Sequence, residues 1–162
     1  MQWVAHNLEP IFDADSRVLI LGTMPSPISR REAFYYANPA NRFWRVMEAV
    51  LGETCPSDPL GKRDWLLRRH IALWDVLCSC SIDGASDQSI RNPVPNDIPH
   101  LLGSSGIVQV FTTGRRAYDL YRRLLQGESI CLPSPSSANC AVSMPQLVEH
   151  YRSILPYLEN PL

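Results

Sequence analysis

Short apolar runs recur along the chain, and each is followed by a loop rich in Ser, Thr, Pro, Asn or Gly. The four clearest runs occupy residues 18–22, 71–76, 107–111 and 129–132. Continuous apolar runs of this length are typical of strands that are buried on both faces of a parallel sheet. The pattern therefore predicts four strands of this kind.

Segments with helical periodicity lie between and after these strands. The predicted helices span residues 42–51, 62–69, 115–125 and 144–158. In the last helix Ser143 is expected to be the N-cap, and Pro145 lies near the start, where proline is tolerated. Strands that alternate with helices indicate an α/β fold, with a mostly parallel sheet covered on both faces.

Two predicted loops, residues 23–40 and 79–95, are longer than ordinary connections. Both leave the C-terminal end of a predicted strand, which is the edge at which open α/β sheets bind ligands. Long connections in a compact domain are more often functional than idle. No repeat, low-complexity tract or linker divides the chain, so residues 1–162 are expected to form one domain.

The charged residues give an ambiguous indication of the partner. The net charge of −1 argues against a strongly basic polyanion-binding protein. Of the 15 basic residues only Lys62 is a lysine, and arginine suits phosphate because its planar guanidinium donates two parallel hydrogen bonds. A high-GC coding bias would produce the same excess of arginine, so both explanations stay open.

The five cysteines indicate neither a disulfide framework nor a metal site, because their number is odd and none form a C-x-x-C pair. Cys78 and Cys80 come nearest to a metal pair, but ordinary thiols at the end of a strand are the favoured interpretation. No stretch resembles a secretory signal or a membrane span. We expect a cytoplasmic protein without membrane association, metal or other cofactor.

The long loops carry amides, hydroxyls and tyrosines, with carboxylates at Asp83 and Asp87. These groups do not resemble a hydrolytic triad, a dinucleotide fingerprint or a Gly-rich phosphate loop with a lysine. They suit a planar, uncharged ligand that forms hydrogen bonds and stacks on a ring. A nucleobase has these properties.

Three motifs give a specific resemblance. They are Gly-Thr-Met-Pro at residues 22–25, Tyr-Ala-Asn-Pro-Ala-Asn-Arg-Phe-Trp at 36–44 and Leu-Pro-Ser-Pro-Ser-Ser-Ala at 132–138. In this order they resemble the uracil-DNA glycosylase superfamily, over roughly residues 18–155. Met24 stands where the mismatch-specific uracil/thymine branch has its catalytic asparagine. This departure, together with Leu-Trp-Asp-Val at 73–76 and the segment 86–96, is more similar to the hypoxanthine-DNA glycosylase branch.

The resemblance implies a three-layer α/β/α fold with a central, mostly parallel four-stranded sheet, and a monomeric enzyme. The implied reaction is hydrolysis of the N-glycosidic bond of a deaminated base that is flipped out of double-stranded DNA. Hypoxanthine is the first choice of base, and uracil, xanthine and mismatched thymine stay open. Stacking and edge hydrogen bonds in a pocket would offset the energy of unstacking the base.

The resemblance places Tyr36 against the flipped base as a stacking ring, with Thr23, Met24 and Asn92 also expected at the base. Because Met24 lacks an amide, Asn41 is the first candidate for orienting water or contacting the base. Asparagine there would also cap the helix that follows, and the two roles can coexist. Asp87 is the second catalytic candidate, as a carboxylate that activates water or stabilises the sugar cation.

The Ser-rich loop is expected to contact DNA. The resemblance implies that Ser134, Ser136 and Ser137 bind phosphates beside the lesion, and that the segment reaching Asn139 enters the gap left by the flipped base. Hydroxyls and backbone amides suit phosphate contact in a protein of low net charge. The alternative is a Pro-Ser turn without function.

Three further residues have less defined roles. Asp75, at the end of a predicted strand, is a weaker catalytic candidate, and an anchor for its loop is the favoured interpretation. Asn92 and Asn96 would either read the base or brace their proline-rich segment. Lys62 lies in the segment Gly-Lys-Arg-Asp, which is expected to be solvated, so the amine needed for strand cleavage is missing and a monofunctional enzyme is predicted.

Two other functions stay open from the sequence. A non-catalytic nucleic-acid-binding module derived from a glycosylase is favoured by Met24 and opposed by Asn41 and Asp87. An enzyme acting on a free nucleoside is a third possibility, but it would not need a Ser-rich loop whose expected partner is the DNA backbone.

Overall fold

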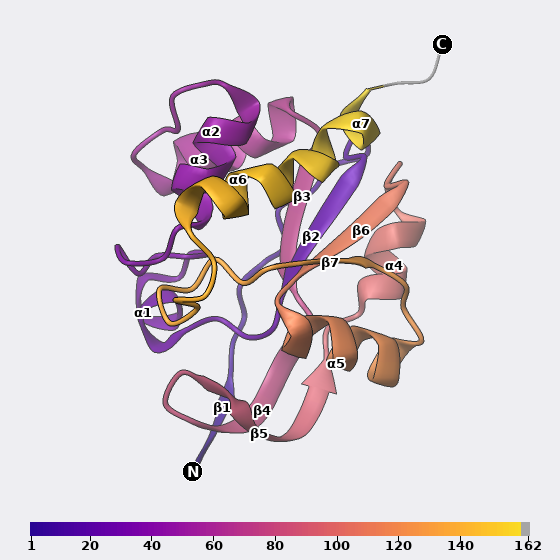
Figure 1. Ribbon diagram of the computed structural model, residues 1–162. Coiled ribbons are helices and arrows are strands. Elements are labelled where there is room, and N and C mark those ends of the chain that lie inside the picture. The colour runs from indigo at the N-terminus through magenta and orange to yellow at the C-terminus, as the bar shows by residue number, and fades with distance from the viewer. Residues whose placement is uncertain (160–162) are drawn as a thin grey trace.

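A four-stranded parallel sheet forms the centre of the protein (Figure 1). The structure is a computed structural model, and it describes residues 1–159. The strands are β2 (Val18–Gly22), β3 (Ile71–Asp75), β6 (Gln109–Thr113) and β7 (Ile130–Leu132), in the spatial order β3-β2-β6-β7. All three pairings are parallel. The four predicted strands are confirmed, although β6 begins two residues later than expected.

Strand β2 shows why a continuous apolar run is needed at the centre of the sheet. Val18 and Ile20 pack into one hydrophobic cluster, and Leu19 and Leu21 pack into another on the opposite face. All four side chains are completely buried. Because successive side chains of a strand point to opposite faces, both faces of this sheet must be covered.

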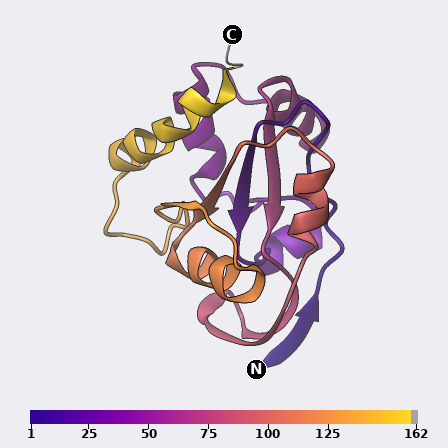
Figure 2. The same ribbon diagram turned by 90° about the vertical axis from the view of Figure 1, so that its right-hand side faces the viewer.

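Helices provide this cover on both sides (Figure 2). One face packs against α2 (Phe43–Leu51), α3 (Pro59–Arg68) and α6 (Met144–Tyr151), and the other packs against α4 (Ile98–Gly103) and α5 (Arg115–Leu125). The 3-10 turn η1 (Arg152–Ile154) and helix α7 (Leu155–Leu158) continue from α6. The three-layer α/β/α architecture is therefore confirmed. The predicted last helix is divided in three, and α4 was not predicted. Helix α1 (Pro27–Glu32) was not predicted either, and it lies within residues 23–40, which were expected to form a loop.

The start of α6 follows the sequence expectation closely. Ser143 is the N-cap, its side chain accepts the N–H of Gln146, and the Gln146 side chain accepts the Ser143 N–H in return. This reciprocal pair satisfies two N–H groups that a helix start leaves free. Leu147 and Tyr151 then lie fully buried against the sheet. The predicted N-cap is confirmed.

A second, antiparallel sheet was not predicted. It contains β1 (Gln2–Ala5), β4 (Leu77–Asp83) and β5 (Ser86–Pro95), in the order β1-β4-β5. The expectation that residues 79–95 form a loop was therefore wrong, since β4 and β5 form a hairpin there. Strand β5 lies at the edge of its sheet, where proline and exposed polar side chains are tolerated, and these residues hide the strand pattern.

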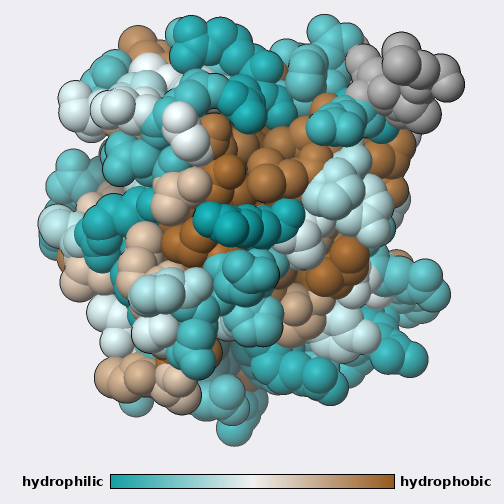
Figure 3. All heavy atoms as spheres, turned by 45° about the horizontal axis from the view of Figure 1, so that its top comes forward, coloured by the Kyte–Doolittle hydropathy of each residue, from teal (hydrophilic) through white to brown (hydrophobic). Residues whose placement is uncertain are grey.

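The surface is polar over most of the view in Figure 3, with apolar residues gathered in the middle of that face. The large apolar side chains that are most exposed among the described residues are Met1, Trp3, Leu60, Val94 and Val108. Within residues 1–159, no helix combines the length and the apolar character needed to cross a membrane.

Candidate active site

A cavity of about 180 Å³ opens at the carboxyl edge of the parallel sheet. Its walls come from the ends of β2, β3 and β6, the segment around helix α1 (Pro27–Glu32), the β4–β5 hairpin and the loop after β7. Most of the site residues predicted from the sequence line it: Thr23, Met24, Tyr36, Asn41, Asp87, Ser134, Ser136 and Ser137. The fold thus brings together residues that are up to 114 positions apart, from Thr23 to Ser137.

Two of the predicted residues are not among those that line the cavity. Asn92 is exposed on β5, with a positive φ of 53°. The Asn139 amide donates to the Ser134 carbonyl oxygen at 3.1 Å, so it braces the Ser-rich loop from within. Asn96 also has a bracing role, because its amide donates to the carbonyl oxygens of Asp75 at 2.9 Å and Leu77 at 3.2 Å.

Tyr36 is held from two sides. Its ring stacks on the ring of Phe43, with centroids 4.1 Å apart and planes 13° from parallel. Its hydroxyl lies 3.2 Å from the Thr113 hydroxyl, which in turn donates to the Leu21 carbonyl oxygen at 3.4 Å, so Tyr36 is the donor of the pair. Because Phe43 covers one face of the ring, a ligand in the cavity can stack on the other face.

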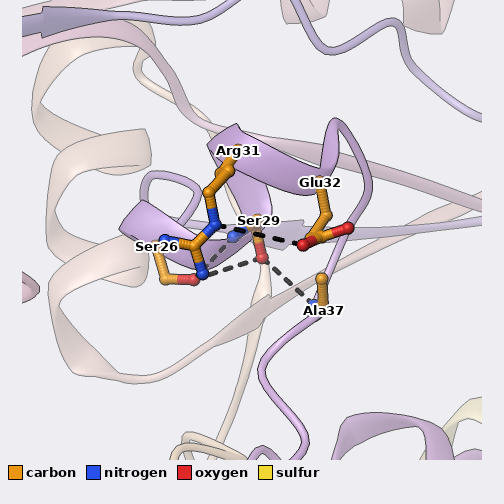
Figure 4. A network of polar contacts seen from close by, with 5 residues as sticks. All are labelled: Ser26, Ser29, Arg31, Glu32 and Ala37. Carbon is orange, nitrogen blue, oxygen red and sulfur yellow. Dashed lines mark hydrogen bonds and ion pairs between the residues drawn. The ribbon is translucent and has the colours of Figure 1, made fainter.

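The chain around Tyr36 is fixed by a small polar network (Figure 4). Ser26 is the N-cap of α1 and accepts the N–H of Ser29 at 3.2 Å. The buried Ser29 hydroxyl accepts the N–H of Ala37 at 3.1 Å, directly after Tyr36. Tyr36 itself has a positive φ of 49°, which is uncommon for a side chain of this size. The network therefore holds the ring in a conformation that the backbone would not favour alone.

Asn41 makes a capping contact at the start of α2 and also lines the cavity. Its Oδ1 accepts the N–H of Phe43 at 2.9 Å, so it satisfies a free N–H at the start of α2 from one residue before the N-cap, Arg42. No hydrogen bond engages its Nδ2 within the described residues, and the side chain lines the cavity. The capping contact fixes the amide and leaves a donor for a ligand or water.

Two carboxyl groups lie in the same cavity. Asp75, at the end of β3, is buried, and burial together with the nearby Asp87 raises its pKa to about 8. Burial also raises the pKa of Asp87, but a hydrogen bond from the Thr23 hydroxyl and the positive charge of Arg116 oppose this rise. The surroundings of Asp87 therefore oppose a negative charge less than those of Asp75, which favour the neutral acid.

Arg42 connects this site to the Ser-rich loop, a role that was not predicted from the sequence. Its guanidinium donates to four backbone carbonyl oxygens, those of Pro135, Ser136, Asn139 and Val142, at 2.6 to 3.4 Å. Its backbone N–H donates to the Pro135 oxygen as well. A guanidinium has five N–H groups in a fixed plane, so it can hold several carbonyls at once. The loop is thereby tied to the start of α2.

The serines of this loop are positioned as donors. Ser134 accepts the N–H of Ser136 at 3.2 Å, and Ser136 accepts the N–H of Ala138 at 3.1 Å. Within the described residues neither hydroxyl donates to a protein acceptor, so their hydrogens can point to a ligand. Ser137 is exposed at the rim. Together these hydroxyls can bind an anionic group at the mouth of the cavity.

Met24 also lines the cavity. Its side chain is 9% exposed and packs with the hydrophobic cluster that includes Leu21 and Ile82. A thioether cannot orient a water molecule as an amide can. Any water in the cavity must therefore be held by other side chains.

Comparisons with known proteins agree with this geometry. The family model described as "Uracil DNA glycosylase superfamily" matches residues 9–159. The chain is 34% identical over 140 residues to the hypoxanthine DNA glycosylase of Methanosarcina acetivorans, covering 84% of this chain and 89% of the relative. It is 31% identical over 134 residues to the hypoxanthine DNA glycosylase of Methanosarcina barkeri, covering 80% and 85%.

A solved structure is also similar over nearly the whole chain. It is a solution NMR structure of a candidate uracil DNA glycosylase from Methanosarcina acetivorans, with a TM-score of 0.81 and 29% sequence identity. The match covers 98% of this chain and 100% of that one. The resemblance found in the three sequence motifs is confirmed, and the protein belongs to the uracil DNA glycosylase superfamily.

Proposed function

We propose that this protein is a monofunctional DNA glycosylase that removes a deaminated base, with hypoxanthine as its preferred base, from double-stranded DNA. The observation that carries the proposal is the cavity in which a stacking ring, an amide and two carboxyl groups converge at the carboxyl edge of the sheet. Relatives named hypoxanthine DNA glycosylase match over most of the chain and support the choice of base.

In this proposal the flipped base lies on the face of Tyr36 that Phe43 leaves open. Phe43 and the hydroxyl contact with Thr113 keep the ring from moving, so little ordering is needed when the base enters. Stacking on an aromatic ring is worth about 1 to 3 kcal/mol per base, which helps to offset the unstacking of the base from the duplex.

Asn41 and Asp87 then act on the water that attacks the sugar. Asp87 keeps the more favourable surroundings for a negative charge, since Thr23 and Arg116 both lower its pKa against the effect of burial. It can take a proton from the water and stabilise the positive charge that develops on the sugar. The Nδ2 of Asn41 orients the water or a polar edge of the base.

The Ser-rich loop binds the DNA backbone beside the lesion. Ser134, Ser136 and Ser137 face the mouth of the same cavity, and Arg42 fixes the shape of their loop. Lys62 does not line the cavity, and its amine lies over the Trp44 ring at 5.1 Å. Base removal without strand cleavage is consistent with that position.

The substrate choice is tested by a single-turnover assay on matched duplexes that carry inosine, uracil, xanthosine or a G:T mismatch. The proposal expects alkali-labile sites in the inosine duplex at the highest rate. Tight binding of all four duplexes without base release would favour the alternative, a non-catalytic DNA-binding module. Met24, in place of an asparagine, is the residue that favours this alternative.

A further inference from the structure

The carboxyl group of Asp75 is buried in the cavity wall and is not fully satisfied by hydrogen bonds. The residue is 5% exposed, it lines the cavity, and its Oδ2 has no hydrogen-bond partner among the described residues. An unpartnered buried polar atom destabilises the fold and is rare in native structures. A strand-end anchor would not need it, since Asn96 already binds the backbone oxygen of Asp75. The side chain is therefore free for another partner.

Glycine at position 22 makes room for this group. A β-carbon there would lie 2.6 Å from Oδ1 of Asp75 and 3.1 Å from the hydroxyl of Tyr36. The carboxyl group thus packs directly against the backbone at the end of β2, beside the hydroxyl of the stacking tyrosine. A base that stacks on Tyr36 would meet Asp75 at its edge.

The groups around Asp75 favour its neutral form. Asp87 faces it from β5, and Tyr36 and Tyr35 face it from the segment after α1. Burial and repulsion by Asp87 keep the pKa of Asp75 at about 8. Two arginines act on other members of this cluster, Arg116 on Asp87 and Arg63 on Tyr35. Neither is among the causes of the pKa shift of Asp75. When the surroundings of two neighbouring carboxyl groups push their pKa values apart, one group commonly acts as an acid and the other as a base.

We propose that Asp75 is the general acid of the reaction, a protonated carboxyl group that donates its hydrogen to a ring nitrogen of the purine as the base leaves. This inference rests on the proposed function, because it assigns the acid for base release at the same site. It also bears on specificity. A purine has unsubstituted ring nitrogens that accept a proton, and uracil has none.

The groups in the cavity account for every proton and electron pair that moves in this reaction. Asp75 gives its proton to the purine, the bond from the base nitrogen to C1′ breaks, and its electron pair leaves with the base, which becomes neutral. Water adds to the positively charged C1′ and loses a proton to Asp87. The products are free hypoxanthine and an abasic sugar with a hydroxyl at C1′. Exchange with solvent returns the proton from Asp87 to Asp75.

The test compares wild type, Asp75→Asn and the control Asp64→Asn, an exposed position on α3, on inosine and uracil duplexes from pH 6 to 9.5. For wild type we expect the single-turnover rate on inosine to fall about tenfold per pH unit above pH 8. Asp75→Asn should lower this rate at pH 7 by about 100-fold and abolish its pH dependence. Uracil release should fall less than tenfold.

Other outcomes separate the two proposals. If wild type releases hypoxanthine and Asp75→Asn does so at the rate of Asp64→Asn, the inference is overturned and the glycosylase proposal stands. The inference is also overturned if the wild-type rate is flat across this pH range, a result that needs no variant to fold. If wild type releases no base from any duplex, the proposed function itself fails.

Discussion

The ring of Phe43 lies against the ring of Tyr36, with centroids 4.1 Å apart and planes 13° from parallel. Phe43 is the first residue of α2 and is fully buried, whereas Tyr36 belongs to the segment after α1 and lines the cavity. The hydrophobic core thus extends to the cavity through one stacked pair. Phe43 and Thr113 together hold the Tyr36 ring in place at the cavity wall.

Replacing Tyr36 separates stacking from hydrogen bonding. Tyr36→Ala should lower kcat/KM on an inosine duplex by about 5- to 150-fold, because stacking on a ring is worth about 1 to 3 kcal/mol. Tyr36→Phe keeps the ring and loses only the hydrogen bond to Thr113, so its activity should fall less than tenfold. Single-turnover kinetics measure both, and equal activity of Tyr36→Ala and wild type would show that the base stacks elsewhere.

Asn41 can be divided into its two contacts by substitution. Asn41→Ser keeps a capping oxygen near the Phe43 N–H but removes Nδ2, and Asn41→Ala removes both. We expect the free energy of unfolding of Asn41→Ser to lie within about 0.5 kcal/mol of the wild-type value. That of Asn41→Ala should be lower than the wild-type value by about 1 kcal/mol. Both should lower the rate of base release by about 100-fold or more.

Urea titration and single-turnover assays on the same samples check this expectation. If base release by Asn41→Ser matched that of wild type while Asn41→Ala was impaired, Asn41 would be a cap without a part in the reaction.

Asp75 should make the protein less stable as the pH rises. In the unfolded chain its carboxyl group ionises near pH 4, and in the folded protein its pKa is about 8. The unfolded state therefore loses this proton first, and the free energy of unfolding falls between these two pH values. Asp75→Asn removes this effect. It should therefore raise the free energy of unfolding at pH 7 by up to about 4 kcal/mol, since each pH unit between about pH 4 and pH 7 contributes about 1.4 kcal/mol.

The measurement is denaturant unfolding of wild type, Asp75→Asn and Asp64→Asn at pH 4.5, 7 and 8.5. The advantage of Asp75→Asn should grow with pH, and Asp64→Asn should follow wild type. An Asp75→Asn variant that is less stable than wild type at pH 7 would mean that the folded protein stabilises the charged form.

Arg42 should control the Ser-rich loop. Arg42→Lys keeps the charge but cannot donate in one plane to four carbonyl oxygens. Because an unsatisfied buried acceptor costs about 1 to 3 kcal/mol, we expect a stability loss of that order and about tenfold weaker binding to an abasic duplex. Arg123→Lys, an exposed position on α5, is the matched control. Unchanged DNA affinity of Arg42→Lys would show that the Ser-rich loop is not part of the DNA-binding surface.

The central sheet was predictable because its strands are apolar on both faces, as Leu19 and Ile20 show by packing into opposite clusters. Helix α5 has the bounds that its pattern predicted, Arg115–Leu125. The β4–β5 hairpin was missed because β5 is an edge strand, which exposes one side and accepts proline. Its sequence therefore resembles that of a loop. Local pattern thus identifies buried elements better than exposed ones.

Only the site residues that lie in recognisable motifs were predictable from the sequence. Tyr36, Asn41 and Asp87 lie in motifs, and all three line one cavity. The state of Asp75 depends on burial and on Asp87, which lies 12 positions away in sequence, so no local signal could reveal it. Arg42 likewise owes its role to carbonyls some 93 to 100 residues away.

The most direct measurement of the central claim follows both products of one turnover on an inosine duplex in ¹⁸O-labelled water. Mass spectrometry should find free hypoxanthine and an uncut strand with an abasic sugar in equal amounts, with the label in the sugar hydroxyl. Base release with simultaneous strand cleavage would contradict a monofunctional hydrolysis. A bound duplex that keeps its base would contradict the assignment of this cavity as an active site.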